Sequence, residues 1–243
     1  MSTNTKDWFT SWFNTPYYHI LYKERDSLEA HAFMQNLTRY LNVSEESHIL
    51  DLACGKGRHS IYLNSIGYQV TGLDLSKDSI AHAKQYENDR LHFDVHDMSK
   101  PYHHQFDAIF NLFTSFGYFE HEDDNLKTIK AIKANLKENG VAVIDFMNTN
   151  FVINNLVSEN ERMIDGITFK LNRQLIDGYI IKDISFEVNG ESYHYRERVK
   201  AFTLKDFQDM FNKANLQLLD VFGDYKLNPY HKETSERLIL IFM

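Results

Sequence analysis

The sequence predicts an α/β protein: a mostly parallel β-sheet covered by helices, with an inserted antiparallel β-meander. Two patterns predict this fold. Between residues 48 and 147, short apolar runs alternate with helical stretches, which is typical of parallel strands buried on both faces. Between residues 162 and 200 there is no helical period, and tight-turn dipeptides separate β-rich segments, which indicates antiparallel hairpins.

Seven strands are expected in the main sheet, over residues 48–53, 68–75, 91–95, 106–112, 141–147, 216–225 and 237–243. Helices are expected in the first forty residues, over 59–65 and 125–136, and after N-caps at Ser76 and Thr203. Asp206 stands in the capping-box position relative to Thr203. The connection into the last strand is short and no helix follows it, so we predict a reversed strand that closes the sheet edge.

The meander is predicted from its turns. Asp165-Gly166, Asp177-Gly178 and Asn189-Gly190 recur every 12 residues, and such dipeptides are the strongest short-range hairpin signal. Four antiparallel strands are therefore expected. The predicted organisation is one domain over 1–150 and 201–243, interrupted by an antiparallel subdomain over 151–200.

The composition limits the classes of partner. The formal net charge is −8, which argues against broad electrostatic binding to nucleic acid or to an anionic membrane. The single cysteine, Cys54, cannot form an internal disulfide, and no stretch approaches the roughly 20 apolar residues of a membrane span. The histidines lack the spacing of a metal-binding motif. We expect a cytoplasmic, soluble protein without metal, membrane or nucleic-acid partners.

Residues 48–59 carry the strongest functional pattern, because a buried strand runs through a glycine turn into a helix. Gly55 and Gly57 let the backbone approach a ligand without a Cβ clash, and a helix N-terminus offers unpaired N–H donors. Asp51, at the end of the strand, can partner an ammonium group. This pattern predicts a site for a nucleotide-like cofactor.

Two further strands lead to acids. The second ends at Asp74, which lies 17 residues after Gly57, near the roughly 20 residues expected between a glycine loop and a ribose-binding acid. A carboxylate there can accept hydrogen bonds from both ribose hydroxyls. The third strand leads to Asp97 and Met98, which can offer a carboxylate to an adenine amine and an apolar side chain to the adenine face.

These motifs resemble those of the class I S-adenosylmethionine-dependent methyltransferases, in detail over about residues 45–148 and by layout over the rest. The family's first loop reads acid-x-Gly-x-Gly-x-Gly, and this sequence has Asp51-Leu52-Ala53-Cys54-Gly55-Lys56-Gly57. Ala53 replaces the first glycine and is the visible departure. The stretch 106–111 resembles the family's fourth motif and places Asn111 at a strand end.

The resemblance implies a Rossmann-like fold and S-adenosyl-L-methionine as the cofactor. The cofactor-binding residues that it implies are Asp51, Ala53, Gly55 and Gly57 for the methionine part, Asp74 for the ribose, Leu75, Asp97 and Met98 for the adenine, and Asn111 near the sulfonium. The implied reaction is methyl transfer to a nitrogen or oxygen atom of a small-molecule acceptor.

Two alternatives compete with this interpretation. A nicotinamide-dependent dehydrogenase also uses a glycine loop and a ribose acid, but its fingerprint needs a third glycine where this chain has Ser60. A non-catalytic cofactor-binding or regulatory protein of the same fold keeps the same pocket. Binding of the cofactor without turnover on any acceptor distinguishes that second alternative from an enzyme.

The acceptor site is less determined, and no catalytic residue is assigned. In the family the substrate faces the segment after the fourth strand, and related insertions and N-terminal helices cover the active site. The candidate acceptor-binding residues are Tyr18, Tyr22, Phe113, Phe116, Tyr118, Tyr195 and Arg198. Each has a structural alternative: packing of the N-terminal helix, burial in the core, or a dimer surface. A monomer and a homodimer both remain open.

Overall fold

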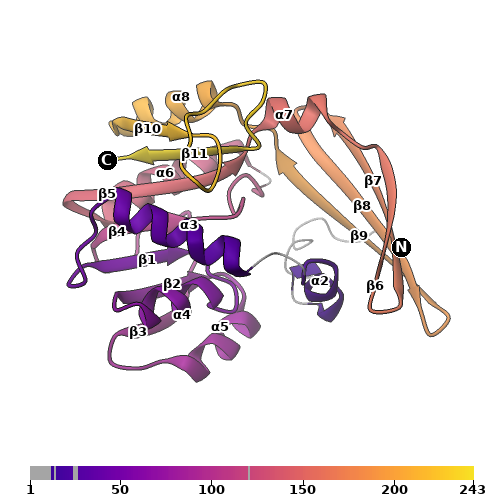
Figure 1. Ribbon diagram of the computed structural model, residues 1–243, viewed down its shortest axis with the longest axis horizontal. Coiled ribbons are helices and arrows are strands. Elements are labelled where there is room, and N and C mark those ends of the chain that lie inside the picture. Colours follow the sequence, from indigo (N-terminus) through magenta and orange to yellow (C-terminus); the bar gives the residue numbers. More distant parts are fainter. Residues whose placement is uncertain (1–11, 14, 24–26, 120) are drawn as a thin grey trace. The chain divides into compact units, whose positions relative to one another are not determined.

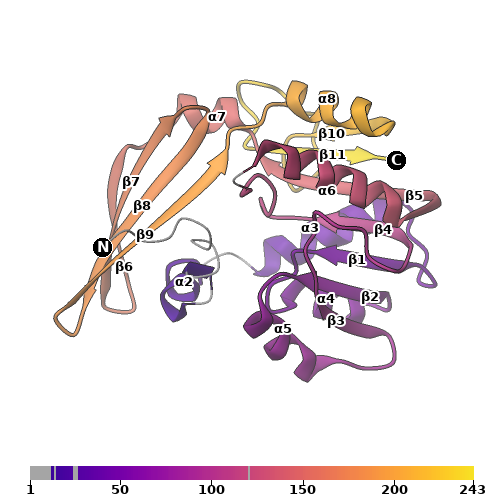
Figure 2. The same ribbon diagram turned by 180° about the vertical axis from the view of Figure 1, so that it is seen from behind.

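The computed structural model describes residues 12–13, 15–23, 27–119 and 121–243. The chain separates into two compact units. The larger unit contains Asp26–Phe151 and Phe202–Met243, and the smaller unit contains Met1–Arg25 and Val152–Ala201. Figures 1 and 2 show the elements of both units from opposite sides.

The larger unit is built on a seven-stranded sheet in the order β10-β11-β5-β4-β1-β2-β3. The five strands from β5 to β3 in this order run parallel, and β11 runs antiparallel to both of its neighbours. The strands are β1 (His48–Leu52), β2 (Gln69–Asp74), β3 (Leu91–Val95), β4 (Phe106–Asn111), β5 (Leu136–Met147), β10 (Leu218–Phe222) and β11 (Arg237–Phe242). The predicted mostly parallel sheet with a reversed last strand is confirmed.

The predicted place of the last strand is wrong in one respect. β11 does not close the sheet, because it lies between β5 and β10, and β10 forms the edge. The burial of the two strands explains the order. All five residues after Arg237 in β11 are buried, whereas every residue of β10 keeps some exposure. An apolar strand needs cover on both faces, and a strand with a polar residue such as Asp220 suits an edge.

Helices cover both faces of this sheet. One apolar cluster joins the sheet to α3 (Ser27–Tyr40), α4 (Arg58–Ser65) and α5 (Lys77–Ala83), which a short 3-10 turn, η2 (Lys84–Tyr86), extends. The opposite face carries α6 (Glu122–Asn135) and α8 (Leu204–Ala214), and Figure 2 shows these two helices nearer the viewer. Phe211 of α8 stacks on Phe242, with 4.2 Å between ring centroids. Apolar strands thus acquire cover on both sides.

Several local signals in the sequence are confirmed. Ser76 caps α5 by accepting a hydrogen bond from the Ser79 N–H at 3.1 Å. Thr203 and Asp206 form a capping box at the start of α8, and Asn215 ends that helix in the left-handed region. Several boundaries of the larger unit differ by one to three residues, and the largest difference is at β5, which begins at residue 136 rather than 141, directly after α6.

The smaller unit is a four-stranded antiparallel sheet in the order β6-β7-β8-β9. Its strands are β6 (Glu159–Ile164), β7 (Ile167–Ile176), β8 (Tyr179–Val188) and β9 (Glu191–Lys200), and α7 (Thr149–Asn154) precedes them in the chain. At each of the three predicted turns both residues have φ between 50° and 80°. Type I′ turns require this geometry, so the predicted meander is confirmed.

The described N-terminal residues pack on this antiparallel sheet. Trp12 and Leu21 are buried in one cluster with Phe169 and Phe186 of the sheet, and α2 (Pro16–Leu21) contributes several of the residues of this cluster. The sequence places 1–150 in one domain, but the structure groups Met1–Arg25 with Val152–Ala201. The reason is burial, since the aromatic residues of the N-terminal segment find their apolar partners on β7, β8 and β9.

In the larger unit, the ring of Phe93 fits against two glycines. A Cβ built on Gly72 of β2 would lie 2.5 Å from the Phe93 ring and 2.9 Å from Cys54 Sγ. A Cβ on Gly57 would lie 2.6 Å from the same ring. Phe93 is 2% exposed, so the ring has little room to move. One aromatic side chain therefore demands glycine both in β2 and in the loop after β1.

We expect Gly72→Ala to lower the free energy of unfolding by about 1–3 kcal/mol, because the added methyl group overpacks the Phe93 ring. Urea denaturation measures this loss. Phe93→Leu in the Gly72→Ala background frees space and should recover part of the loss, while Phe93→Leu alone should be destabilising. Unchanged stability of Gly72→Ala would show that the ring moves freely.

Candidate functional site

The loop after β1 has an unusual backbone. Ala53, Gly55 and Gly57 have φ values of 64°, 56° and 80°. The loop turns on itself through the Gly57 N–H, which donates to the Cys54 carbonyl at 3.0 Å. The Cys54 N–H donates to the Leu73 carbonyl at 3.0 Å and so ties the loop to β2. The left-handed region favours glycine, and for an alanine it costs about 1–2 kcal/mol.

Asp74 holds the same loop from the end of β2. Its carboxylate accepts hydrogen bonds from the Gly55 N–H and the Ser76 N–H, each at 2.8 Å. Burial raises the pKa of Asp74, and the backbone donors at Ser76, Gly55 and Leu75 oppose that increase. The acid that the sequence assigns to the ribose thus also fixes the backbone of the glycine loop.

Asp51 lies at the end of β1 and is 3% exposed. The Ser60 hydroxyl donates to its carboxylate at 2.6 Å. Burial raises the pKa of Asp51 to about 6, and the bond from Ser60 opposes this while the charge of Asp74 adds to it. In the sequence, Ser60 is distinguished only by standing where the dinucleotide fingerprint has its third glycine. The two residues are nine positions apart, and this spacing matches no helical or strand repeat that would predict the contact.

Asn111 ends β4 and is fully buried. Its Nδ2 donates to the Leu52 carbonyl at 2.9 Å, which links β4 to β1. Its Oδ1 has no hydrogen-bond partner among the residues that the structure describes. A buried acceptor without a partner is costly, so this oxygen fits a ligand that brings an N–H or O–H donor.

The residues expected near the adenine differ among themselves. Leu75 follows β2 and is 52% exposed, and Val95 at the end of β3, which the sequence did not single out, is 43% exposed. These two apolar side chains suit the face of a flat ring. Asp97 instead accepts bonds from the Ser99 N–H and hydroxyl at 3.0 and 2.7 Å. Burial raises the pKa of Asp97, but the bonds from Ser99 and the charge of Lys100 outweigh this effect. The pKa of Asp97 therefore lies below its ordinary value. Met98 is half-buried.

The segment after β4 contains two consecutive left-handed residues. Phe113 and Thr114 have φ values of 58° and 60°, which is rare for aromatic and β-branched residues. The Phe113 ring lies 4.5 Å from the His59 ring and 5.5 Å from the Tyr225 ring, centroid to centroid. Of the predicted acceptor-binding residues in the larger unit, Phe113 and Tyr118 are half-buried.

Phe116 is the exception in this segment. It is fully buried, and its ring packs against those of Phe202 and Phe207 at 5.9 and 5.5 Å. The alternative of core packing therefore describes Phe116 in this structure, and it lines no surface. The segment contains both buried residues and partly accessible ones, and the aromatic residues in the sequence do not reveal which are which.

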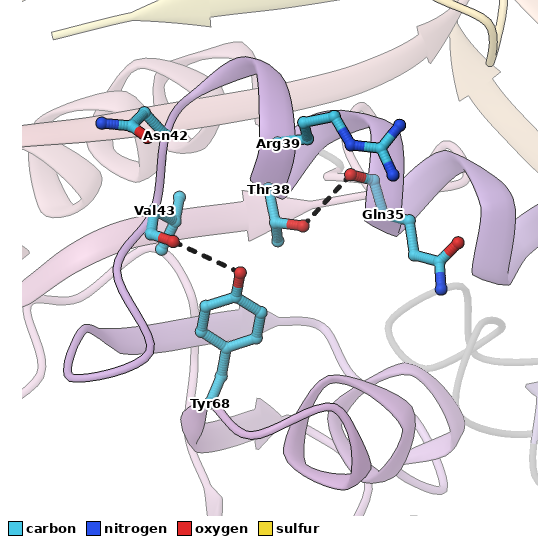
Figure 3. A pocket seen from close by; sticks show the side chains of 6 residues that line it. All are labelled: Gln35, Thr38, Arg39, Asn42, Val43 and Tyr68. Carbon is cyan, nitrogen blue, oxygen red and sulfur yellow. Dashed lines mark hydrogen bonds between the residues drawn. The ribbon is translucent and has the colours of Figure 1, made fainter.

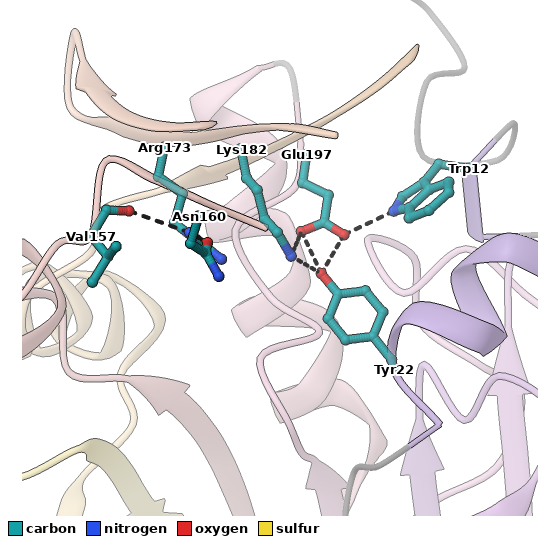
Figure 4. Close-up of polar contacts among 7 residues, drawn as sticks. All are labelled: Trp12, Tyr22, Val157, Asn160, Arg173, Lys182 and Glu197. Carbon is teal, nitrogen blue, oxygen red and sulfur yellow. Dashed lines mark hydrogen bonds and ion pairs between the residues drawn. The ribbon is translucent and has the colours of Figure 1, made fainter. Parts of the chain in front are cut away.

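The other candidates lie in the smaller unit. Tyr18 packs edge-on against Trp12 at 5.7 Å, and Tyr195 lies 4.5 Å from the same indole. The Tyr22 hydroxyl donates to Glu197 at 2.7 Å. Figure 4 shows Glu197 between Tyr22, Lys182 and Trp12, whose Nε1–H donates to it at 2.8 Å. These tyrosines hold the N-terminal segment on the sheet.

Arg198 lies on the opposite face of β9 from Tyr195 and Glu197, as the strand alternation requires. Its guanidinium lies 3.4 Å from the centroid of the Tyr179 ring. Tyr195 and Arg198 therefore cannot face one ligand from the same side of the sheet.

A separate pocket of about 310 Å³ lies beside the C-terminal end of α3. Figure 3 shows its lining, in which Tyr68 donates to the Val43 carbonyl at 3.3 Å. Tyr68 precedes β2, whereas Asp74 ends it, so this pocket lies at the other edge of the parallel sheet from the acids. In the described ranges, no helix is long and apolar enough to span a membrane, and no three His, Cys, Asp or Glu side chains are grouped to hold a metal ion.

The fold and the site define a class of protein. Acids at the ends of β1 and β2, a left-handed glycine loop and a buried amide at the end of β4 meet at the carboxyl edge of a parallel sheet. Ligands bind at this edge in open α/β sheets, where a glycine loop leads into a helix. The site is that of a protein that binds a nucleotide-type cofactor.

Comparison with known proteins identifies the family. The profile of a family described as "Methyltransferase domain" matches residues 43–215. The chain belongs to this family and is a class I S-adenosylmethionine-dependent methyltransferase, with S-adenosyl-L-methionine as its cofactor. The resemblance inferred from the sequence motifs is confirmed.

Relatives match over most of their length. The chain is 29% identical over 227 residues to the Bacillus subtilis (strain 168) protein named "Putative methyltransferase YqeM", covering 88% of this chain and 91% of that protein. It is 24% identical to a glycine/sarcosine N-methyltransferase of Aphanothece halophytica, covering 89% and 82%. It shares the fold of an S-adenosylmethionine-dependent methyltransferase from Clostridium acetobutylicum ATCC 824, with a TM-score of 0.78, 22% identity and coverage of 93% and 95%.

The raised pKa of Asp51 predicts that ligand binding at this carboxyl group depends on pH. The resemblance assigns the cofactor's ammonium group to Asp51, and a nearby positive charge favours the carboxylate. Because burial raises the pKa of Asp51 to about 6, its carboxyl group carries a proton in part of the free protein near that pH. We expect binding of S-adenosylhomocysteine to release protons, so that affinity rises from pH 5 to pH 7 and then levels off.

Calorimetry at pH 6, in two buffers of different ionisation enthalpy, measures this proton release. Asp51→Asn should remove the buffer dependence and weaken binding. Asp89→Asn, at an exposed acid, is the matched control and should retain both. Equal proton release by the parent and by Asp51→Asn would rule out Asp51 as the source.

Proposed function

We propose that this methyltransferase transfers a methyl group from S-adenosyl-L-methionine to a small-molecule acceptor, with an amine nitrogen preferred over an oxygen. The observation that carries the proposal is the similarity, over 89% of the chain, to a protein named as a glycine/sarcosine N-methyltransferase. The net charge of −8 also favours a small acceptor over a nucleic acid.

The cofactor roles inferred from the sequence fit the observed geometry. Asp51 and loop 53–57 would hold the methionine part of the cofactor. Asp74 would bind the ribose and, through its bond from the Gly55 N–H, also fix the loop. Leu75, Met98 and Asp97 would contact the adenine, with Asp97 already engaged by Ser99. The Asn111 Oδ1 is a buried acceptor that needs a donor, which suits a position close to the methionine part.

The proposed reaction needs little acid–base catalysis from the protein. The bound cofactor supplies an electrophilic methyl group on a sulfonium. The chain's own residues align an acceptor with it and keep water away, since in-line displacement depends on geometry. An amine acceptor needs only to be unprotonated, so no strong general base is required. The partly accessible Phe113 and Tyr118 are the proposed acceptor wall in the larger unit.

We propose that residues 151–200 act as a lid and contribute Tyr195, with Tyr18 and Tyr22 of the N-terminal segment beside it. Tyr195→Phe should then raise KM for the acceptor while it leaves affinity for S-adenosylhomocysteine unchanged.

We further propose a cytoplasmic protein that is a monomer or homodimer and has no nucleic-acid partner, supported by the net charge and the single, buried, unpaired Cys54.

Asp74→Ala should weaken the binding of S-adenosylmethionine and S-adenosylhomocysteine by about 10- to 100-fold, because it removes a charged hydrogen-bond acceptor for the ribose and unties Gly55. Isothermal calorimetry on the parent protein and on Asp74→Ala measures the change in affinity. Asp89→Ala, which removes an exposed carboxylate nearby in sequence, should bind as the parent does. If Asp74→Ala also binds as the parent does, the assignment of Asp74 fails.

The acceptor class is tested by turnover. We expect S-adenosylhomocysteine to form when the enzyme is given amines such as glycine, sarcosine or an aminodeoxy sugar. The matched hydroxyl compounds, such as glycolate for glycine, should react at least about 10-fold more slowly, because a neutral hydroxyl is a weaker nucleophile without a base. Faster turnover of the hydroxyl compounds would overturn the amine preference. Tight cofactor binding without turnover on either set would favour a non-catalytic role.

A further inference from the structure

A buried ion pair lies at the carboxyl edge of the larger unit, outside the cofactor residues. Asp145, near the end of β5, is fully buried, and the side chain of Arg237, at the start of β11, is 18% exposed. The Arg237 Nε and Nη2 groups lie 2.8 and 2.7 Å from the Asp145 Oδ1. Since Ile239 is the direct partner of Asp145 across the two strands, Arg237 reaches it diagonally.

The same pair fixes the segment after β4. The Phe113 N–H donates to the Asp145 Oδ2 at 2.7 Å, and the Thr114 N–H donates to the Asp145 carbonyl at 3.0 Å. Arg237 Nη2 also donates to the Thr114 hydroxyl at 2.9 Å. The backbone N–H groups of Phe113 and Thr114 are thus bound to Asp145, and the Thr114 hydroxyl is bound to Arg237.

These contacts hold a conformation that the segment does not prefer. Phe113 and Thr114 both lie in the left-handed region, which aromatic and β-branched side chains rarely adopt. Without the bonds to Asp145 and Arg237, the two residues would relax to ordinary backbone angles. The ion pair therefore decides where the Phe113 ring and the Thr114 hydroxyl lie.

The position of Phe113 matters for the site. Asn111, with its unpartnered buried oxygen, is two residues before it. The Phe113 ring stacks on His59, the second residue of the helix that follows the glycine loop. It also lies 6.0 Å from the Phe33 ring of α3. The strained segment is therefore packed directly against the cofactor-binding elements of the same unit.

We propose that Asp145 and Arg237 are positioning residues for methyl transfer, which hold Phe113 and Thr114 in the geometry that aligns the acceptor. The inference rests on the proposed acceptor site in residues 112–118. Neither Asp145 nor Arg237 is assigned to cofactor binding, so their loss should act on the acceptor and leave the cofactor bound.

The test compares acceptor kinetics with cofactor affinity, using an amine that the parent enzyme methylates. We expect Asp145→Asn to lower kcat by about 100-fold, since small displacements of aligned groups cost that much, while the Kd for S-adenosylhomocysteine changes less than about threefold. Arg237→Lys keeps the charge but loses the forked geometry, so it should lower kcat less than Asp145→Asn does.

Thr114 supplies a matched pair that leaves the ion pair intact. Thr114→Ser keeps the hydroxyl that Arg237 binds and should lower kcat less than Thr114→Val does. Thr114→Val keeps the shape but loses the hydroxyl, and it should lower kcat by about 10-fold. Ile241→Val, at a buried position elsewhere in β11, controls for a general loss of stability and should leave kcat and KM near the parental values.

Rescue by glycine separates positioning from stability. Glycine adopts the left-handed region freely, so Asp145→Asn should lower kcat by a smaller factor in the Thr114→Gly background, which already lacks the hydroxyl, than in the parent. The proposal is overturned if Asp145→Asn weakens cofactor binding as much as it lowers kcat, or if Thr114→Val and Thr114→Ser behave alike. A parent enzyme that methylates no amine or hydroxyl acceptor would instead refute the proposed function, and this inference with it.

Discussion

The buried pair of Asp145 and Arg237 joins the antiparallel side of the larger sheet to the segment after β4. Each partner depends on the other, because removing one side of a buried ion pair leaves an uncompensated charge and costs about 3–5 kcal/mol. A pair of apolar residues could fill such a site with equal stability. What an apolar pair cannot do is bind the Phe113 N–H and the Thr114 hydroxyl. The charged pair thus gives the carboxyl edge a defined shape at the segment that packs on His59, just after the glycine loop.

The grouping of the residues proposed to bind the cofactor was predictable because they lie at the ends of parallel strands. In a parallel sheet all carboxyl ends meet at one edge, so the positions of Asp51, Asp74 and Asn111 in the sequence already place them together. The helix starts were predictable for a similar reason. A capping residue and its partner are three residues apart, as Thr203 and Asp206 are, and short-range bonds of this kind leave a direct trace in the sequence.

The rest of the candidate site depends on contacts between residues that are far apart in the chain. Arg237 meets Asp145 across 92 residues, and nothing in the pattern of an apolar last strand shows where its first side chain points. An acid inside the apolar run of β5 was a possible signal, and so was an arginine at the start of β11. The order of β10 and β11 was missed for the same reason. Burial of Phe116 and the packing of Trp12 on the meander follow from tertiary contacts that periodicity does not encode.

The distribution of backbone strain separates structural turns from the candidate site. Among the described residues, nine non-glycine residues have positive φ, and five of them are Asn or Asp, which tolerate that region best. These five end helices or form the turns of the meander. The other four are Ala53, Phe113, Thr114 and Leu227. All four lie in loops at the carboxyl edge of the seven-stranded sheet, after β1, after β4 and between β10 and β11. In the part of the chain that the structure describes, backbone strain at residues other than Asn and Asp is therefore confined to this edge, where the proposed cofactor loop and acceptor wall would need fixed positions.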